Sequence, residues 1–216
     1  MNWRRCIAAA LLLVAGSTSA QQRNINFDLL QAARSGSVAT TAALLDQGAN
    51  PNSRNRLGDT PLNTAARNGN VELVRLLLER GADVNLPNLA RVTPLMSAVY
   101  GGHTEVARML LAAKASVEPS DRMEKTAMIY AAGNGNAECV AALLAAGVSV
   151  NQKYANDATA LMWAAAYGKN DSVQLLLERG ADVAARDNRG ETALSIAVAE
   201  KHAETAALLR AAGAGK

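Results

Sequence analysis

Apolar side chains recur along this chain in pairs of short segments, and each segment has the spacing of one helical face. In the clearest pair, the apolar faces are formed by Leu62, Ala65 and Ala66 in the first segment and by Leu73, Val74, Leu77 and Leu78 in the second. Asn68 and Gly69 lie between the segments, and glycine readily takes the left-handed conformation that ends a helix. The pattern therefore predicts two short antiparallel helices joined by a tight turn.

Polar residues, proline and glycine mark where these two helices begin and end. Thr60 is a good N-cap because its hydroxyl satisfies an orphan amide of the first turn, and Pro61 suits the first helical position. The second helix is expected to begin near Asn70 and to end at Gly81. A loop over residues 82–92 then leads to the next Thr-Pro pair, so the unit is helix, turn, helix and loop.

This unit repeats every 33 residues. Threonine marks the first helix at Thr60, Thr93, Thr126, Thr159 and Thr192, and glycine ends the second at Gly48, Gly81, Gly147, Gly180 and Gly213. Lys114 stands where this series requires one more glycine. Two independent markers in one register indicate a stack of small units, none of which buries its apolar face alone.

The period divides the chain into a short leader and six units. The approximate units are residues 24–59, 60–92, 93–125, 126–158, 159–191 and 192–216. The first unit lacks the Thr-Pro start and has Phe27-Asp28-Leu29 in its place. End units are expected to be atypical because their outer faces meet water. Residues 21–216 therefore form one repeat domain, with no room for another domain or a linker.

One unit carries a specific series of residues: Gly58-Asp59-Thr60-Pro61-Leu62, Ala65-Ala66, Gly69-Asn70, Leu77-Leu78 and Gly81-Ala82-Asp83-Val84-Asn85. This series closely resembles the ankyrin repeat, and the resemblance covers about residues 24–214. It implies an all-α fold, an elongated, slightly curved solenoid of six helix-turn-helix units with hairpin-like loops along one edge. Modules of this kind typically bind other proteins in the concave groove formed by the loop tips and the first helices.

The chain departs from the family pattern in three ways. The histidine expected after Thr-Pro-Leu is replaced by Asn63, Met96, Ile129, Met162 and Ser195. The proline is lost in the last three units. The loop glycine found at Gly58 and Gly190 becomes Arg91, Glu124 and Asp157 in the middle loops. These changes leave the fold prediction intact but leave the geometry of the middle loops open.

The first twenty residues have the order of a secretory signal peptide. Arg4 and Arg5 precede an apolar run over residues 6–15, and small residues follow as far as Ala20, which makes Gln21 the expected new N-terminus. The apolar run is shorter than a transmembrane helix requires, which favours a cleaved signal peptide. The alternative is that the segment stays uncleaved and anchors the protein in the membrane. The paired arginines leave open whether export follows the general or the twin-arginine route. We expect a periplasmic bacterial protein with no membrane attachment after cleavage.

Composition and charge narrow the class of partner. Half of the residues are hydrophobic but only 3% are aromatic, so alanine and leucine must form most of the core. The formal net charge is +3, and it falls to +1 once Arg4 and Arg5 are removed. No run of five or more like charges occurs, so a nucleic-acid surface is not indicated. We expect a monomer that binds a protein.

The residues capable of chemistry do not form a catalytic or metal-binding set. His103 and His202 lie three units apart, so they cannot share a metal, and both are expected to form hydrogen bonds between neighbouring units. Cys139 stands alone once Cys6 leaves with the signal, and it falls at the register of Leu73 and Val106. A buried apolar role is expected for Cys139, with a reactive or intermolecular thiol as the alternative. No cofactor is expected.

Large side chains at variable registers of the loop tips and first helices mark the expected binding surface, because such residues are enriched at interface centres. The predicted partner-binding residues are Tyr100, Tyr167, Met123, Arg122, Lys125, Trp163, Tyr130, Leu89, Arg56, Arg67, Asn156 and Arg189. Tyr100, Tyr167 and Met123 are the expected central anchors. The alternative for the four aromatic residues is that they only fill the space between units.

Two classes of function follow from these predictions. In the first, the chain is a non-catalytic module that binds one protein in the periplasm. The resemblance to exported bacterial ankyrin proteins implies a role in assisting or protecting an enzyme such as a catalase, or alternatively in neutralising a periplasm-targeted toxin as an immunity protein. In the second class, which the sequence favours less, the chain is itself an enzyme or a small-ligand carrier.

Export gives the first testable prediction. Protein purified from the periplasmic fraction of a bacterial host should begin at Gln21 or within a few residues of it, as N-terminal sequencing would show. A chain that begins at Met1 and stays in the cytoplasm or the membrane would contradict the signal-peptide prediction.

Overall fold

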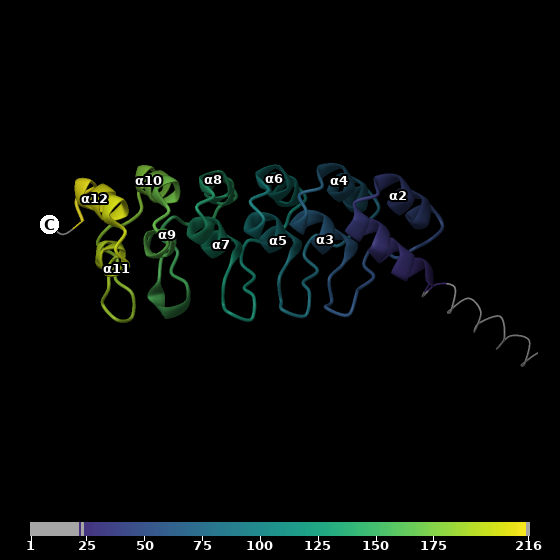
Figure 1. Cartoon of the computed structure of the whole chain (residues 1–216), viewed down its shortest axis with the longest axis horizontal. Helices are drawn as coiled ribbons and strands as arrows, with labels where there is room; N and C mark the ends of the chain where they lie inside the picture. The colour runs from purple at the N-terminus through teal and green to yellow at the C-terminus, as the bar shows by residue number, and fades with distance from the viewer. Residues whose placement is uncertain (1–21, 23, 215–216) are drawn as a thin grey trace, which may run out of the picture.

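The computed structural model describes residues 22 and 24–214, so the predicted signal peptide lies outside the described residues. Figure 1 shows pairs of antiparallel helices standing side by side in one row, with the loops projecting along one edge. The first helices of the units lie beside the loops, and the second helices form the opposite side of the row. The predicted all-α repeat solenoid is confirmed.

Each unit contributes two helices. The first unit has a helix over residues 24–35 and α2 (Val38–Asp46). The later pairs are α3 (Pro61–Arg67) and α4 (Val71–Glu79), α5 (Pro94–Tyr100) and α6 (Thr104–Ala112), α7 (Ala127–Asn134) and α8 (Ala137–Ala145), α9 (Ala160–Ala166) and α10 (Asn170–Glu178), and α11 (Ala193–Ala199) and α12 (Ala203–Ala211). The described residues contain no β-strand, only one isolated bridge between Ser120 and Thr126.

A threonine cap starts the first helix in five of the units. The Thr60 hydroxyl accepts a hydrogen bond from the Asn63 amide at 3.1 Å, and the other four threonines make the equivalent bond. Proline follows the cap only at Pro61 and Pro94, while alanine takes this position in the last three units. The first helix forms in all five units, so the cap rather than the proline is the constant signal.

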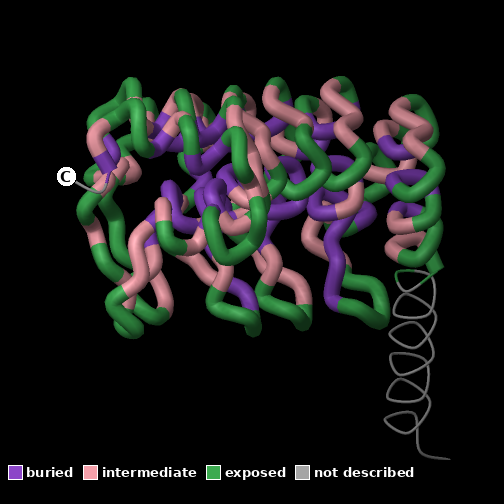
Figure 2. Tube along the Cα trace, turned by 60° about the vertical axis from the view of Figure 1, so that its left-hand side comes forward, coloured by how far each residue is buried: buried purple, intermediate pink, exposed green. Residues whose placement is uncertain are grey.

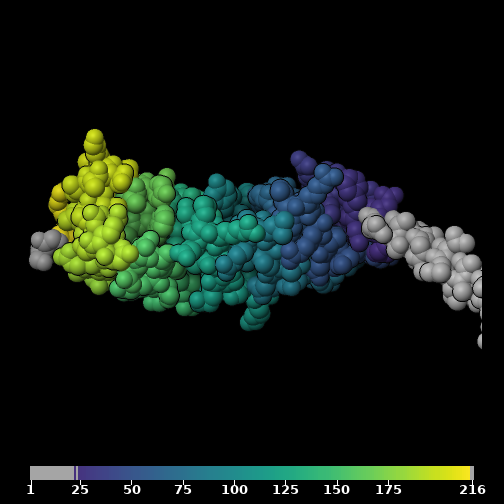
Figure 3. Space-filling view, turned by 90° about the horizontal axis from the view of Figure 1, so that it is seen from below, coloured from purple at the N-terminus to yellow at the C-terminus, as the bar shows by residue number. Residues whose placement is uncertain are grey.

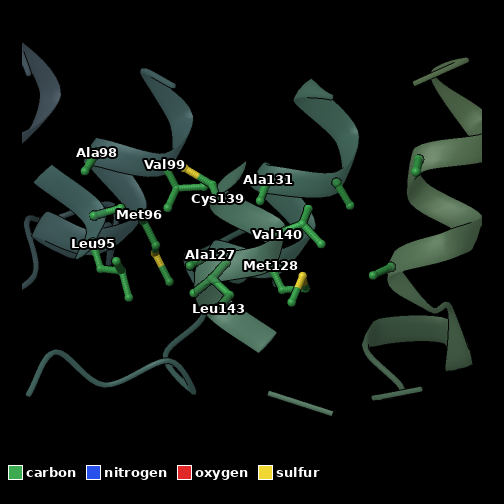
Figure 4. Packing of buried hydrophobic residues seen from close by; sticks show 14 of the residues in the cluster. Leu95, Met96, Ala98, Val99, Ala127, Met128, Ala131, Cys139, Val140 and Leu143 are labelled. Carbon is green, nitrogen blue, oxygen red and sulfur yellow. The ribbon is translucent and has the colours of Figure 1, made fainter. Parts of the chain in front are cut away.

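The core combines small residues of the first helices with larger apolar residues of the second helices. Figure 2 shows buried residues running through the middle of the stack. In Figure 4, Cys139, Val140 and Leu143 of α8 lie among residues of α5 and α7, which include Met96, Val99, Ala127 and Ala131. Leu77 and the residues at its register in the next three units, Leu110, Leu143 and Leu176, are at most 1% exposed. The predicted register of the second helices is therefore confirmed.

The middle loops keep a positive φ at the position where the first and fifth loops have glycine. Gly58 and Gly190 both have a φ of 78°, and Arg91, Glu124 and Asp157 occupy the same left-handed region at 64°, 59° and 60°. A side chain in this region costs about 1–2 kcal/mol, which the surrounding loop must offset. The loss of glycine from the middle loops therefore does not change the sign of φ at this position.

One polar side chain at the tips of the first, second, third and fifth loops stabilises the turn. The Asn55 carboxamide oxygen accepts hydrogen bonds from the Leu57 amide at 2.8 Å and the Asp59 amide at 3.0 Å. The equivalent pair of bonds recurs at Asn88, Asp121 and Asp187. Tyr154 holds this register in the fourth unit and cannot accept them in this way. The tip there is instead the 3₁₀ helix η1 (Ala155–Asp157), in which Asn156 also has a positive φ.

An asparagine in three of the loops joins one unit to the next. The Asn52 Oδ1 atom accepts a hydrogen bond from the Asp83 amide at 2.8 Å, and its Nδ2 atom donates to the Gly81 carbonyl at 3.4 Å. Asn85 and Asn151 make the same two bonds to their following units. Glu118 replaces this asparagine in the third unit. Pro119 follows it and disfavours the helical conformation needed for the turn found in the sister loops.

The loop layer consequently has a gap between the third and fourth units. Backbone bonds join neighbouring loop tips at Leu89 to Leu57, at Arg122 to Ala90 and at Asn188 to Asn156, with lengths of 3.0, 3.1 and 3.0 Å. No such bond joins the third tip to the fourth within residues 24–214. A cavity of about 370 Å³ opens there, lined by Glu118, Tyr154 and neighbouring residues. Between these two units the described loops lack both the asparagine bonds and the tip-to-tip backbone bond, so the contact rests mainly on the packed helices, together with the hydrogen bond from the Tyr130 hydroxyl to Asp121.

Leu143→Ala should therefore have a larger effect than an equivalent change near an end. Loss of the buried side chain should lower the free energy of unfolding by about 2–5 kcal/mol, and it should separate the unfolding of the two halves. Denaturant unfolding with hydrogen exchange would measure both effects, with Leu77→Ala as the matched control. Equal, mild effects of the two substitutions would contradict this account.

Restoring the missing loop contacts should stabilise the protein. The double variant Glu118→Asn/Pro119→Leu copies Asn85 and Leu86 of the preceding unit. The variant should regain two or three hydrogen bonds, which stabilise the folded state. Removal of proline gives the unfolded chain more entropy, which offsets part of this gain. The free energy of unfolding should therefore rise by about 1 kcal/mol.

Glu118→Asn alone is the control for that variant and should gain little, because Pro119 still prevents the turn. Urea denaturation would compare the two proteins. If the single and the double variant were equally stable, proline would not be the cause of the gap.

Candidate protein-binding groove

The loop tips and first helices present most of the predicted binding residues to solvent. Leu89, Tyr100, Met123 and Tyr167 are 56%, 62%, 67% and 50% exposed. Arg56, Arg67, Arg122, Asn156 and Arg189 are also exposed, whereas Lys125, Tyr130 and Trp163 are half-buried. Figure 3 shows the face formed by the loop edge of the stack as a continuous elongated surface. Such large exposed apolar side chains indicate a surface for recognition.

Four rings and one ammonium group form an aromatic row across the third to fifth units. Tyr100 and Tyr130 meet edge to face with centroids 5.4 Å apart, and Trp163 and Tyr167 are stacked at 6.2 Å. The Lys125 Nζ atom lies 5.8 Å from the Tyr130 ring and 5.3 Å from the Trp163 ring. These are favourable aromatic and cation–π geometries. We call this set, Tyr100, Lys125, Tyr130, Trp163 and Tyr167, the aromatic row.

Gly133 allows the row to remain continuous in the fourth unit. It takes the register of Tyr100, and a Cβ atom at Gly133 would lie 3.4 Å from the Tyr167 ring. Tyr167, whose own register is one residue later, therefore leans over the position where the fourth unit has no side chain. Two residues of different registers are brought onto one surface in this way.

Tyr130 is fixed by the third loop. Its hydroxyl donates a hydrogen bond to Asp121 Oδ2, while Asp121 Oδ1 accepts bonds from the Met123 amide at 2.8 Å and the Lys125 amide at 2.9 Å. Burial, reinforced by the Asp121 carboxylate, raises the pKa of Tyr130 well above its ordinary value. Tyr130 thus supports the row, and the more exposed Tyr100 and Tyr167 are the rings available to a partner.

A depression lies beside the C-terminal end of the row. Its volume is about 670 Å³, and Trp163, Arg189 and Ile196 are among the residues that line it. The indole Nε1 atom of Trp163 is buried and has no hydrogen-bond acceptor among the described residues. An unsatisfied buried donor is costly, so a partner that supplies an acceptor here would gain affinity.

A second depression, of about 840 Å³, lies at the N-terminal end of the groove. Its lining includes Phe27 and Arg34 of the first helix, Arg54, Arg56 and Leu57 of the first loop, and Arg67 of α3, and we call this set the N-terminal basin. The predicted residues Arg56 and Arg67 meet here, about three units away from Trp163 and Tyr167. The predicted site is therefore divided between two parts of one groove.

Arg34, Arg54 and Phe27 also line the groove, although they are not among the residues predicted from the sequence. Arg34 precedes Arg67 by one period, so register counting could have found it. The first unit lacks the Thr-Pro marker, however, so its register is less evident from the sequence than that of the later units. Asp121 is not among the predicted residues either, although it falls at the register of Asn55, Asn88 and Asp187, so register counting could have found it.

The described residues with reactive side chains have structural roles. The imidazole Nε2 atoms of His103 and His202 lie 2.9 Å from the Arg67 carbonyl and 3.1 Å from the Ala166 carbonyl, so both histidines join neighbouring units as predicted. Cys139 is fully buried, and burial raises the pKa of its thiol. Within residues 24–214, no cluster of three or more His, Cys, Asp or Glu side chains could hold a metal ion. Likewise, no described helix is both long and apolar enough to cross a membrane.

Comparisons with known proteins agree with this geometry. The family model described as ankyrin repeats in three copies matches residues 9–88, 29–123, 86–154, 114–187 and 146–216. The crystal structure of the human ASB11 ankyrin repeat domain is similar, with a TM-score of 0.79 and 30% identity, and the match covers 87% of this chain and 84% of that chain. A comparison with curated proteins finds no match. Ankyrin repeat proteins are generally non-catalytic modules for protein–protein interaction.

Five overlapping matches leave only the first eight residues uncovered, and the match coincides with the stacked helix pairs and the projecting loops. The chain belongs to the ankyrin repeat family.

Proposed function

We propose that this protein binds one partner protein through the aromatic row and the neighbouring loop tips. The observation that carries the proposal is the exposure of Tyr100, Tyr167 and Met123 on one face while Tyr130 and Asp121 hold the surface in place. A rigid, prearranged aromatic surface loses little conformational entropy when a partner docks. The core has no use for these three exposed side chains, so a stability role does not account for them.

We further propose that this interaction takes place in the periplasm of a bacterium. The support is the signal-like order of residues 1–20, with Arg4 and Arg5 before an apolar run and small residues ending at Ala20. The partner in this proposal is an enzyme that the protein assists or protects, such as a catalase, as in the exported bacterial ankyrin proteins that the chain resembles. An immunity protein that neutralises a periplasm-targeted toxin is the second candidate.

A capture experiment would identify the partner and separate the two candidates. The tagged protein would be recovered from periplasmic extract of the native host, and bound proteins would be identified by mass spectrometry. A host enzyme whose activity or lifetime rises with this protein present supports assistance. Inhibition of a secreted toxic enzyme supports immunity.

Substitutions in the aromatic row should then weaken binding without unfolding the protein. Tyr100→Ala and Tyr167→Ala should each reduce affinity for the captured partner by more than about tenfold, since central aromatic anchors contribute about 2 kcal/mol or more. Arg122→Gln at the rim should mainly lower the association rate and its dependence on salt. Calorimetry and stopped-flow kinetics would measure these effects, and thermal unfolding would confirm that the variants remain folded.

Exposed residues of the second helices provide the control. Glu105→Lys on α6 and Gln174→Glu on α10 should leave affinity unchanged. If these changes abolished binding while both tyrosine variants bound normally, the partner would use the back of the solenoid, and the proposed site would be wrong.

A further inference from the structure

The N-terminal basin differs chemically from the aromatic row. Four guanidinium groups, those of Arg34, Arg54, Arg56 and Arg67, surround one depression. Among the described residues that line it, only Asp59 carries a carboxylate. Asp28 is exposed in the adjacent helical turn, but it does not line the basin. Positive charge is therefore concentrated at one end of a chain whose overall charge is small.

The carboxylate of Asp59 neutralises only one of these arginines. Its side chain is 4% exposed and pairs with the Arg67 guanidinium at 2.9 Å. It also accepts a hydrogen bond from Asn88 Nδ2 at 2.8 Å. Burial alone would raise the pKa of the Asp59 carboxyl, but the bonds from Asn88 and Arg67 outweigh burial and lower that pKa. Asp59 is thus ionised and buried, and its carboxylate oxygens are already bound by Arg67 and Asn88.

The other three arginines remain available. Arg34, Arg54 and Arg56 are exposed, and none of them has an ion-pair partner in the described part of the chain. Guanidinium groups bind carboxylates in a planar, two-point geometry that lysine does not reproduce. Three such groups around a depression form a surface that is complementary to several carboxylates.

Large apolar side chains lie beside the arginines. Phe27 is 57% exposed, and Leu57 is 66% exposed between the basin and the next loop tip. The Leu89 amide donates to the Leu57 carbonyl at 3.0 Å, so the exposed Leu89 side chain and Arg91 continue this surface on the second loop. At the third tip Glu124 adjoins Arg122 and Met123, and the excess of positive charge ends there.

We infer that the N-terminal basin binds an acidic segment of a protein, in which glutamate or aspartate residues flank a large apolar residue. The carboxylates of that segment pair with Arg34, Arg54 and Arg56, and its apolar residue contacts Phe27 and Leu57. The inference rests on the proposed protein-binding function and adds a second, charge-selective contact to it. The exposed apolar side chains favour a peptide over a nucleic acid, whose outer surface is phosphate and sugar.

A designed peptide tests the inference without knowledge of the natural partner. The probe is a fluorescein-labelled peptide of about twelve residues, long enough when extended to cross neighbouring units, in which glutamate alternates with leucine and phenylalanine. Its control is the same peptide with glutamine in place of glutamate. Fluorescence anisotropy at low salt should give a dissociation constant below about 1 mM for the glutamate peptide and affinity at least about tenfold weaker for the glutamine peptide.

Matched variants of the full chain locate the contact. Arg54→Gln/Arg56→Gln should weaken binding of the glutamate peptide by about tenfold or more, and Leu57→Ser should weaken it by a smaller factor. Arg75→Gln/Arg108→Gln removes the same charge from exposed positions on α4 and α6, and affinity should change by less than about twofold. Circular dichroism would confirm that every variant is folded.

Several results would overturn the inference. These are equal affinity for the two peptides, no binding below about 1 mM, an equal loss in the Arg75/Arg108 control, or tighter binding of a single-stranded oligonucleotide than of the glutamate peptide. If the glutamate peptide did not bind but Tyr100→Ala lost partner binding, only the proposed acidic-segment site would be rejected, and the aromatic row would stand. If both tyrosine variants bound the partner normally and the glutamate peptide still bound, only the proposed role of the aromatic row would be rejected.

Discussion

Each unit of the stack leaves apolar side chains uncovered until its neighbours pack against it, and the rest of the structure depends on this mutual burial. Leu77, Leu110, Leu143 and Leu176 occupy one register and are all buried, while the alanines of the first helices allow close approach. Short helices of seven to nine residues have little stability of their own in water. Their stability therefore comes from the neighbouring units, and the loops and the groove are held in place by the same contacts.

The loops are joined by a separate set of polar contacts. Asparagines at three loop bases and backbone bonds at the tips connect neighbouring units, but both kinds of contact are missing between the third and fourth units. Glu118, Pro119 and Tyr154 explain their absence, because each replaces a residue that makes a bond elsewhere in the stack. The repeat is regular in its core and irregular in its loops. This distribution is expected where packing selects the core and recognition selects the surface.

The variable positions of the groove carry two chemically different surfaces. In the third to fifth units, Tyr100 and Tyr167 are presented on a support made by Tyr130, Asp121 and Lys125. At the N-terminal end, arginines and exposed apolar side chains surround a depression in which the one carboxylate of the described lining, Asp59, is paired with Arg67. A partner that contacts both regions would gain selectivity from two chemically different surfaces, since each rejects a different set of wrong partners.

The sequence by itself determined the fold, the helix starts, the core leucines and most of the exposed groove residues, because all of these follow from a fixed period of 33 residues. Register counting could also have located Arg34. The tertiary structure alone showed Lys125 between Tyr130 and Trp163, Tyr167 over Gly133, and the gap beside Glu118. These features depend on contacts between units or on the absence of such contacts. A periodic pattern gives the position of a residue in its unit, but the direction of a long side chain is set by the neighbours it meets across the stack.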